Sequence, residues 1–543
     1  MCILTTQQGP EGTIRLSRSE PTAADLVTPG PAAPRPFIRQ RPAPSQPAES
    51  RYNWRLPTSR GLPAVSVWDI GIVILYVVGI IGLGWAVSRR VTTFRDYFVA
   101  GGRMTAPLLI CTLVSTYYGL DVLLGSSEVA YQSGIVAWFA YARPYYIVIL
   151  IAAFTIARRL RRYDFLSVPD IGAHFYGVGT QRVLAVASFV YSLPILGFMG
   201  LGIVMDVTLG IPFVWGVLFG ALVAVVYTIL GGLLADALTD TVQFTLMCVT
   251  LGIATVIAVN SAGGVDVLRD RLAPSFFEPT GSYPIWVLVV FAGAALSALV
   301  EPAFYQRIFA AVNYRAIVVA LLVGIVLWAA FDWAVAIVGM VARAEGIETE
   351  ARYALLTMTM QSLPVGAKGV FVASVLATSM STVDSYLLIA GGNLSYDLVR
   401  PAIRRPMGDR ELLRLTRWMI AVAAVVTIVL ALFFQTVVSA WIFMSTSLIA
   451  AALVPIVGGL YFGRFATPTA GLAASAVGLA VALGYYVLVH TFGAFDAQWE
   501  TQIWTVRAGR HTLELWQEYA LLFALPASTG AFILGALVGR KRG

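Results

Sequence analysis

The stretch GVFVASVLATSMSTVDSYLLIAG, residues 369–391, carries the most information about the fold. It is long and apolar enough to cross a bilayer as a helix, yet hydroxyl side chains and Asp384 crowd its middle. An ionised aspartate at bilayer depth costs about 2.5–3.5 kcal/mol or more, so this surface should meet protein, water or an ion rather than lipid. One face of the helix carries hydroxyls spaced four, three and four residues apart: Ser374, Thr378, Ser381 and Ser385.

Two explanations fit this hydroxyl face. Clustered hydroxyl oxygens, opposite the backbone carbonyls of a neighbouring helix, suit a hard cation such as Na⁺ better than a soft metal. Alternatively, the hydroxyls hold neighbouring helices together, which is a common role of Ser and Thr in membranes. The spacing alone favours neither explanation.

The composition is that of a polytopic membrane protein. Of 543 residues, 58% are hydrophobic and 12% are charged, whereas soluble domains have about 25% charged residues. Residues 1–65 are rich in Pro and lack a long apolar run, so we expect a disordered tail and no signal peptide. The domain that follows, 66–543, has apolar runs that predict thirteen membrane-spanning helices, at 66–88, 107–128, 134–157, 183–206, 212–231, 240–260, 284–300, 315–341, 366–391, 415–435, 437–461, 468–490 and 517–539.

Lys and Arg in the short loops predict the orientation of these helices. With the N-terminus of the first helix outside, the cytoplasmic segments hold 21 Lys and Arg residues, Arg307 among them, against seven on the other side. We therefore expect a multi-pass protein of the cytoplasmic (inner) membrane, with its N-terminus outside and its C-terminus inside. The same bias accounts for the net charge of +8 without a nucleic acid partner.

Five segments in order along the chain carry a family resemblance. Together they resemble the sodium:solute symporter family over about residues 94–401, and it is their order and spacing that make the resemblance specific. The segments are DYFVAGGR (96–103), SVPD (167–170), YTILGGLLA with TDTVQ (within 227–243), EPAFYQR (301–307) and MSTVDS (380–385).

The resemblance implies an all-α, LeuT-like fold of two inverted five-helix repeats, each with a broken first helix. The sequence supports both breaks, since Ser115–Asp121 puts polar, aromatic and glycine residues in mid-span and Glu301-Pro302 interrupts another helix. Irregular backbone is tolerated in a membrane only where it lines a cavity or is buried in protein. The alternative for Pro302 is an ordinary helix end. The repeats would span 107–260 and 284–461, with one extra helix before them (66–88) and two after (468–490 and 517–539).

The family's sodium site implies a set of ligands in this chain, with Na⁺ as the driving ion. The hydroxyl ligands would be Ser381 and Thr382. The backbone carbonyl ligands would come from Thr378, Ser115 and Tyr118. Thr378 stands where family members usually have a small apolar residue, a difference that leaves the carbonyl in place.

The resemblance also places the solute beside the two breaks, near the midplane. Glu301 replaces a neutral amide common in the family, and Asp121 adds a second carboxylate. Two acids favour either a cationic or amine-bearing solute or a hydroxyl-rich one. Arg143 has an alternative as a structural partner of Asp121, Glu128 or Asp332. The expected wall consists of Tyr117, Asp121, Val122, Glu301, Tyr141, Arg143, Trp441 and Ser445.

Two further acids are candidates for ion coupling or gating. Asp384, one turn beyond Ser381, either tunes the ion site or pairs with a basic residue of a cytoplasmic loop. Asp240 follows the Gly231-Gly232 pair, whose glycines permit close packing or a tight turn. We expect Asp240 to cap the helix that follows and to belong to a gate hinge, without binding the ion directly.

The sequence thus predicts a secondary active transporter, not an enzyme, that couples Na⁺ to the symport of a small polar organic solute by alternating access. One alternative is proton coupling on the same scaffold through Asp121, Glu301 or Asp384. Another is a membrane enzyme or sensor, which would need clustered catalytic residues or an output domain, and we expect neither. The motifs do not specify the solute or the oligomeric state.

Overall fold

The computed structural model describes residues 65–88, 93–281, 283–403, 405–433, 437–496, 501–508 and 511–540. The predicted tail, 1–65, lies outside the described residues except for Val65. The helices are α1 (Val67–Ser88), α2 (Phe94–Val99), α3 (Ala106–Tyr117), α4 (Leu120–Ser133), α5 (Arg143–Phe154), α6 (Ile156–Leu160), α7 (Val168–Tyr176), α8 (Val178–Tyr191), α9 (Ile195–Leu209), α10 (Phe213–Ser261), α11 (Val265–Arg271), α12 (Ile285–Ala294), α13 (Pro302–Ala310), α14 (Tyr314–Ala344), α15 (Ala354–Ser362), α16 (Ala367–Gly392), α17 (Arg400–Ala402), α18 (Asp409–Ala431), α19 (Val437–Tyr461), α20 (Pro468–Phe492) and α21 (Ala520–Arg540).

The described ranges contain eleven helices that are long and apolar enough to cross a membrane, or twelve when the bent pair α3 and α4 counts as one span. A helical polytopic membrane protein is therefore confirmed, but the count of thirteen is not. The difference lies in α10, because the predicted helices 212–231 and 240–260 are two parts of this one element. Its first part, Phe213–Val226, is shorter than a full span.

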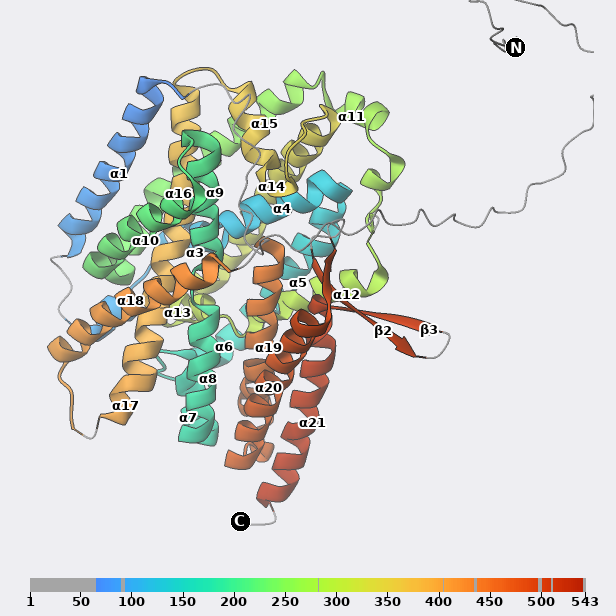
Figure 1. Ribbon diagram of the computed structural model, residues 1–543. Coiled ribbons are helices and arrows are strands. Elements are labelled where there is room, and N and C mark those ends of the chain that lie inside the picture. The colour runs from blue at the N-terminus through green and yellow to red at the C-terminus, as the bar shows by residue number, and fades with distance from the viewer. Residues whose placement is uncertain are drawn as a thin grey trace, which may run out of the picture. The chain divides into compact units, whose positions relative to one another are not determined.

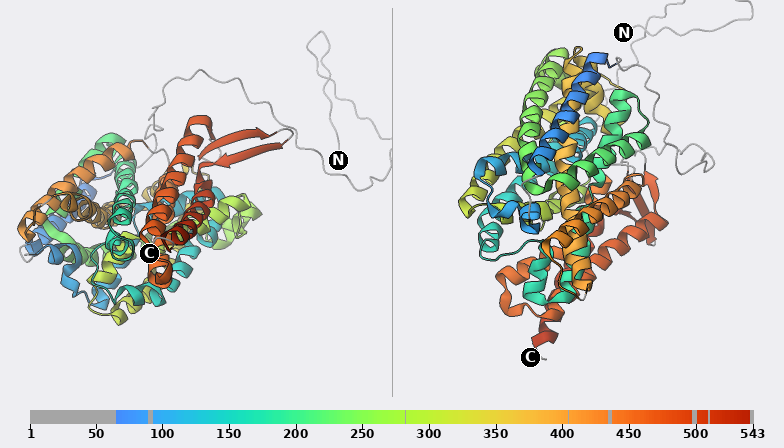
Figure 2. Two further views of the ribbon diagram at one scale, coloured as in Figure 1. Left: turned by 90° about the horizontal axis from the view of Figure 1, so that it is seen from below. Right: turned by 90° about the vertical axis from the view of Figure 1, so that its left-hand side faces the viewer.

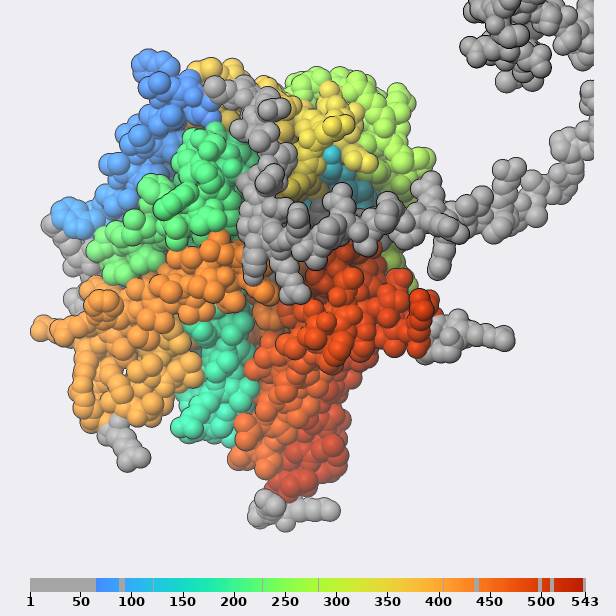
Figure 3. All heavy atoms as spheres, viewed as in Figure 1, coloured from blue at the N-terminus to red at the C-terminus, as the bar shows by residue number. Residues whose placement is uncertain are grey.

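The helix α16, which contains the hydroxyl face, lies at the centre of the bundle. Nearly all of its residues are buried, and it packs against α1, α3, α9, α10 and α18. Figures 1 and 2 show α1 on the outer side of α10 and α16. In Figure 3, α8 reaches the surface between the orange segment of α17 and α18 and the red helices α20 and α21. The polar residues of α16 therefore face protein, as a bilayer requires.

Both predicted helix breaks are present. The first helix of the predicted repeat one divides into α3 and α4, which meet at Tyr118 and Gly119 at an angle of 51°. At the second break, α12 continues as a 3₁₀ turn, Ala295–Leu299, and α13 begins at Pro302. Proline is well suited to the first position of a helix, because its missing N–H would have no partner there. The breaks thus occur where each predicted repeat begins, and the repeat boundaries themselves stay a prediction.

A third interruption, at Gly232 within α10, joins two of the sequence motifs. Gly232 has φ 63° and ψ −179°, a conformation open to glycine but strained for other residues. The chain bends there against Tyr97, whose hydroxyl donates to the carbonyl oxygen of Thr228 at 3.0 Å. A Cβ at Gly232 would lie 2.6 Å from the Tyr97 ring. The close packing and turn expected from the glycine pair are therefore confirmed.

We predict that Gly232→Ala lowers the stability of the protein. Backbone strain contributes about 1–3 kcal/mol, and the clash with Tyr97 adds to this loss. The fraction of monodisperse protein left after heating in detergent measures this loss. Gly252→Ala in the same helix is the matched control, because nothing lies within 4 Å of its added Cβ. Equal thermal stability of the two variants would contradict the strain at Gly232.

One part of the described chain forms β-strands. Between α20 and α21, the strands β1 (Ala494–Asp496), β2 (Thr501–Ala508) and β3 (His511–Trp516) form an antiparallel sheet in the order β1-β2-β3. The all-α prediction is wrong for this segment, although it holds for the membrane-spanning part. The segment joins two spans and has no long apolar run, so a search for spanning helices passes over its short alternating strands.

Candidate functional site

Two hydroxyls of α16 face the broken end of α3. The Oγ atom of Ser381 lies 3.1 Å from the carbonyl oxygen of Ser115 and 3.0 Å from that of Thr378. The Oγ1 atom of Thr382 lies 3.1 Å from the carbonyl oxygen of Thr116 and 3.3 Å from that of Thr378. All five residues are buried. The structure therefore brings two hydroxyl and three carbonyl oxygens together between two helices.

This donor set fits a small hard cation. Na⁺ prefers oxygen ligands, and all five atoms are oxygens without competing nitrogen or sulfur. Each hydroxyl now donates to a carbonyl, and it can rotate to turn a lone pair toward an ion. Ser381, Thr382, Thr378 and Ser115 belong to the set expected from the sequence.

The carbonyl that contacts Thr382 is that of Thr116, which the sequence did not identify, and the carbonyl of Tyr118 stays a predicted ligand. The helical part of α3 ends at Tyr117, so Tyr118 lies at the break itself. The ring of Tyr118 packs against Phe331 with 4.8 Å between ring centroids.

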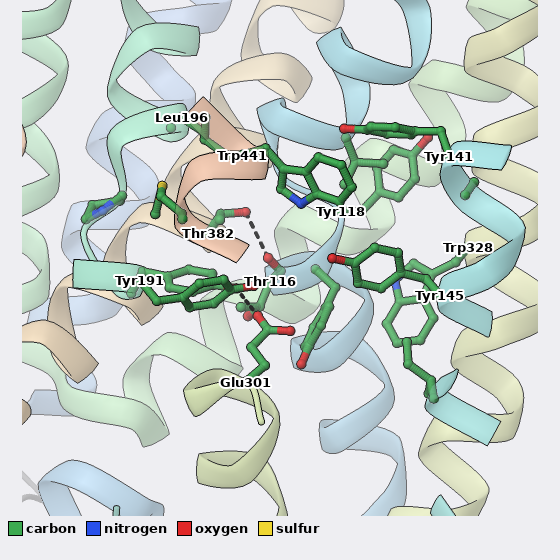
Figure 4. A pocket seen from close by; sticks show the side chains of 18 of the residues that line it. Thr116, Tyr118, Tyr141, Tyr145, Tyr191, Leu196, Glu301, Trp328, Thr382 and Trp441 are labelled. Carbon is green, nitrogen blue, oxygen red and sulfur yellow. Dashed lines mark hydrogen bonds between the residues drawn. The ribbon is translucent and has the colours of Figure 1, made fainter. Parts of the chain in front are cut away.

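Beside these oxygens lies a cavity with about 940 Å³ of empty space, which includes its opening (Figure 4). Thr116 and Thr382 belong to its wall, so the cavity and the oxygen cluster share one side. Of the residues expected to contact the solute, five line this cavity: Tyr117, Val122, Glu301, Tyr141 and Trp441.

Two of the expected wall residues, Arg143 and Ser445, are not part of this lining, and a third cannot be placed. The side chain of Asp121 lies outside the described part of the structure. Arg143 is exposed, and its guanidinium lies 5.1 Å from the ring centroid of Phe139, so its assignment to the wall is wrong. Ser445 is fully buried and also lies outside the lining. Arg143 follows a π-helical turn, Ala137–Ala142, which changes the face on which residues point.

The cavity has several wall residues that the sequence did not identify. Asp332 is one of them, and its carboxylate accepts hydrogen bonds from Tyr146 and, at 3.4 Å, from Ser126. Hydroxyls therefore surround Asp332, and pairing with Asp332, one of the three alternatives for Arg143, is wrong. Many of the others are aromatic. The acidic and aromatic wall residues found only in the structure are Tyr145, Tyr146, Tyr191, Trp328, Asp332 and Tyr386.

Glu301 lies where the second broken helix resumes. It is the residue before the first turn of α13, and its side chain is 1% exposed. Tyr386, from α16, donates a hydrogen bond to its carboxylate, and Figure 4 shows Glu301 beneath Thr382, near Tyr191. The positive end of the α13 dipole favours a carboxylate at this position. Glu301 thus presents negative charge to a cavity that adjoins the oxygen cluster.

A buried polar network lies behind the α3 break. The guanidinium of Arg307, on α13, forms an ion pair with Asp236 of α10 at 3.2 Å. Its Nη2 atom also contacts hydroxyls of Ser385 (2.6 Å), Thr116 (2.8 Å) and Thr112 (3.1 Å). Arg307 was counted as a cytoplasmic loop residue, which is wrong, since its side chain is 1% exposed. Without Arg307, Lys and Arg are still more numerous in the predicted cytoplasmic segments than on the other side, so the predicted orientation does not change.

The two acids expected at a gate both belong to this buried region. Asp240 lies about two turns into the helix after Gly232 and accepts a hydrogen bond from the hydroxyl of Ser115 at 3.3 Å. Its expected role as a helix cap is therefore wrong. Asp384 is 2% exposed and accepts from the backbone N–H of Ser385 at 2.8 Å. Its described neighbours are acidic, Asp236 and Asp240, so pairing with a loop cation is also wrong.

A sequence model of the sodium:solute symporter family matches residues 97–478. The chain belongs to this family. It is a Na⁺-coupled solute symporter and not an enzyme. The resemblance identified from the five motifs is thereby confirmed.

Relatives in this family include two symporters of Escherichia coli (strain K12). The sodium/pantothenate symporter is 25% identical over 440 residues, which cover 75% of this chain and 88% of the relative. The sodium/proline symporter is 25% identical over 387 residues, covering 66% and 75%. Among solved structures, the substrate-bound, outward-open state of a Na⁺-coupled sialic acid symporter matches with a TM-score of 0.72 at 15% identity, over 87% of this chain and 98% of that one. This match confirms the LeuT-like fold.

Proposed function

We propose that this symporter carries a small polar organic solute across the cytoplasmic membrane, with Na⁺ bound between α16 and the α3 break. The observation that carries this proposal is the shared wall. Thr382 contributes its hydroxyl to the oxygen cluster and also lines the cavity. An ion that draws α16 and α3 together therefore shapes the cavity that receives the solute.

The proposed ion ligands are the hydroxyls of Ser381 and Thr382 and the carbonyls of Thr378, Ser115 and Thr116. All five oxygens would contact the ion, and the three carbonyls would also fix the spacing of the two helices. We further propose that the N-terminus of α1 lies outside and that the end of α21 lies inside, from the distribution of Lys and Arg. Alternation between outward- and inward-open states would proceed at the breaks.

The ion gradient is sufficient for uphill transport. A potential of 100 mV is worth about 2.3 kcal/mol per charge, and a tenfold Na⁺ gradient adds about 1.4 kcal/mol. Their combined effect supports about 500-fold accumulation with one ion per solute. The two relatives are named for pantothenate and proline. These solutes are chemically unlike, so the family alone does not name the solute.

The proposal predicts that NaCl, but not KCl at equal ionic strength, raises the melting temperature of the purified protein. This titration needs no solute, since an ion that binds only the folded state stabilises it. A metabolite screen in both salts should then find a solute whose stabilisation requires Na⁺. Uptake into proteoliposomes that proceeds equally in NaCl and KCl would contradict the proposed coupling.

A second candidate function is proton coupling on the same scaffold. The buried acids Asp236, Asp240 and Asp384 lie near one another and Arg307 pairs with Asp236, so protons are one means of balancing the remaining charge. An imposed pH gradient, applied in KCl, separates the two candidates. Uptake driven by that gradient favours protons, and uptake that requires NaCl favours the proposed function.

A further inference from the structure

The ribbon formed by strands β2 and β3 lies beside the helical bundle. Figure 1 and the left view of Figure 2 show it projecting sideways past α20 and α21 instead of continuing along their axes. The eight residues of β2 extend over about 25 Å. The main contacts of β2 among the described elements are with β1, β3, α20 and the 3₁₀ turn Gln517–Tyr519. The far part of the ribbon therefore extends beyond the helices.

One side of this ribbon is apolar. Successive residues of a strand point to opposite sides, and residues directly opposite each other in an antiparallel pair point to the same side. Trp504 is opposite Leu515, and Val506 is opposite Leu513, so these four side chains lie on one side. Phe495 of β1 extends it. We call these five residues the apolar face of the ribbon.

The far part of the ribbon is polar on its other side. Thr505 is opposite Glu514, and Arg507 is opposite Thr512. All four of these residues are exposed. On the apolar face, Leu513 is 56% exposed as well. An apolar surface that stays exposed beside a polar one typically marks a site of contact with a partner or a membrane.

Hydrogen bonds fix the start of β2 to the helices. The hydroxyl of Thr501 donates to the carboxylate of Glu518 at 2.5 Å. The Nε2 atom of Gln517 donates to the hydroxyl of Thr501 at 2.9 Å and to that of Ser439, on α19, at 2.7 Å. Thr501, Gln517 and Glu518 are all buried. The ribbon therefore leaves the bundle in a defined direction, and its apolar face points to a defined side.

The apolar face continues the exposed apolar surface of α20. Phe492, the last residue of this spanning helix, is 63% exposed, and its ring lies 5.6 Å from that of Trp504, between centroids. Where β3 leads into α21, the rings of Trp516 and Tyr519 stack at 6.3 Å. Trp and Tyr are enriched where a membrane meets water. The ribbon thus leaves the helices at the expected level of the membrane interface, with its apolar face on the side of Phe492.

Water is a poor environment for the apolar face. A two-stranded ribbon without further packing is marginally stable in water. Pairing of another chain along the edge of β3 would add backbone hydrogen bonds, but it would leave the apolar face uncovered. Lipid covers this face and leaves the polar side in water, as it does for amphipathic helices that lie in the membrane interface.

We propose that the ribbon lies on the bilayer, with its apolar face in contact with the lipids of one leaflet. Because the end of α21 is proposed to lie inside, this is the outer leaflet. The apolar face enters the boundary between headgroups and acyl chains to a depth of about 5–10 Å, as interfacial helices do. This inference goes beyond the proposed function and does not depend on the ion site or on the solute.

Spin labels on the full-length protein in phospholipid nanodiscs test this contact. Leu513→Cys and Glu514→Cys each carry a nitroxide at neighbouring positions of β3, on the apolar and the polar side. The native Cys2, Cys111 and Cys248 are replaced by serine. O₂ concentrates in lipid, whereas a nickel chelate stays in water. We expect the ratio of O₂ to chelate collisions to be severalfold higher for Leu513→Cys than for Glu514→Cys.

A second pair of labels on β2, Val506→Cys and Thr505→Cys, repeats the comparison on the other strand. If the serine background is not monodisperse, the same labels are measured in protein with its own cysteines, corrected for labelled wild type. Equal access of the chelate to both sides of the ribbon overturns the inference. A label on the apolar face that neither reagent reaches also overturns it, because protein, such as a second copy of this chain, then covers that face.

Discussion

Replacing both Ser381 and Thr382 by alanine is expected to abolish the response of this symporter to Na⁺. Each hydroxyl oxygen would contact the ion directly, and a hydrogen-bond-strength interaction with a charged group is worth about 1.5–3 kcal/mol. Losing two of them should weaken Na⁺ binding by about a hundredfold or more. Titration of the melting temperature with NaCl measures this loss, and Na⁺-dependent uptake into proteoliposomes measures its consequence.

The matched control for this double substitution is Thr427→Ala. Thr427 is also a buried threonine of a spanning helix, and its hydroxyl donates to the carbonyl of Ala423 at 2.8 Å, far from the site in sequence. Its substitution removes the same chemical group but should leave the NaCl response intact. A double variant that retains the wild-type Na⁺ response would contradict the ion site. Uptake that survives the double substitution and follows a pH gradient would instead favour proton coupling.

The ion cluster could be predicted in part because its signal is local. Ser381 and Thr382 stand in a motif on one face of one helix, and the helix breaks have glycine, proline and polar residues at the position of the break. The carbonyl ligand opposite Thr382 could not be fixed in this way. The contact of Thr382 with the carbonyl of Thr116 depends on where the backbone leaves the helix, which the sequence does not specify.

The cavity wall and the buried ion pair could not be predicted from the sequence, and the reason is different. Tyr191, Trp328 and Tyr386 lie on three helices, and nothing in their local sequence distinguishes them from rings that pack in the core. Arg307 and Asp236 are 71 residues apart. Each looks like an isolated charge near a helix end until the fold brings α13 against α3 and α16.

Among the single substitutions considered, Arg307→Met is expected to lower the stability of the protein most. It leaves the Asp236 carboxylate buried without its cation, a change that typically costs about 3–5 kcal/mol. The contacts of Nη2 with Thr112, Thr116 and Ser385 are lost as well. The yield of monodisperse protein and its melting temperature in detergent measure the effect. Arg405→Met is the control, because the Arg405–Glu411 pair is exposed and such pairs contribute about 0–1 kcal/mol.

The double variant Arg307→Met with Asp236→Leu separates charge from packing. If the cost of Arg307→Met arises from an unpaired carboxylate, removing that carboxylate should restore most of the melting temperature, as replacing whole buried ion pairs by apolar residues often does. No recovery in the double variant would instead mean that Arg307 acts through the hydroxyls around it. Those hydroxyls include that of Thr116, whose carbonyl contacts Thr382. A stable double variant with a weakened NaCl response would therefore connect this ion pair to the geometry of the ion site. In that case Arg307 positions the α3 break without contacting the ion.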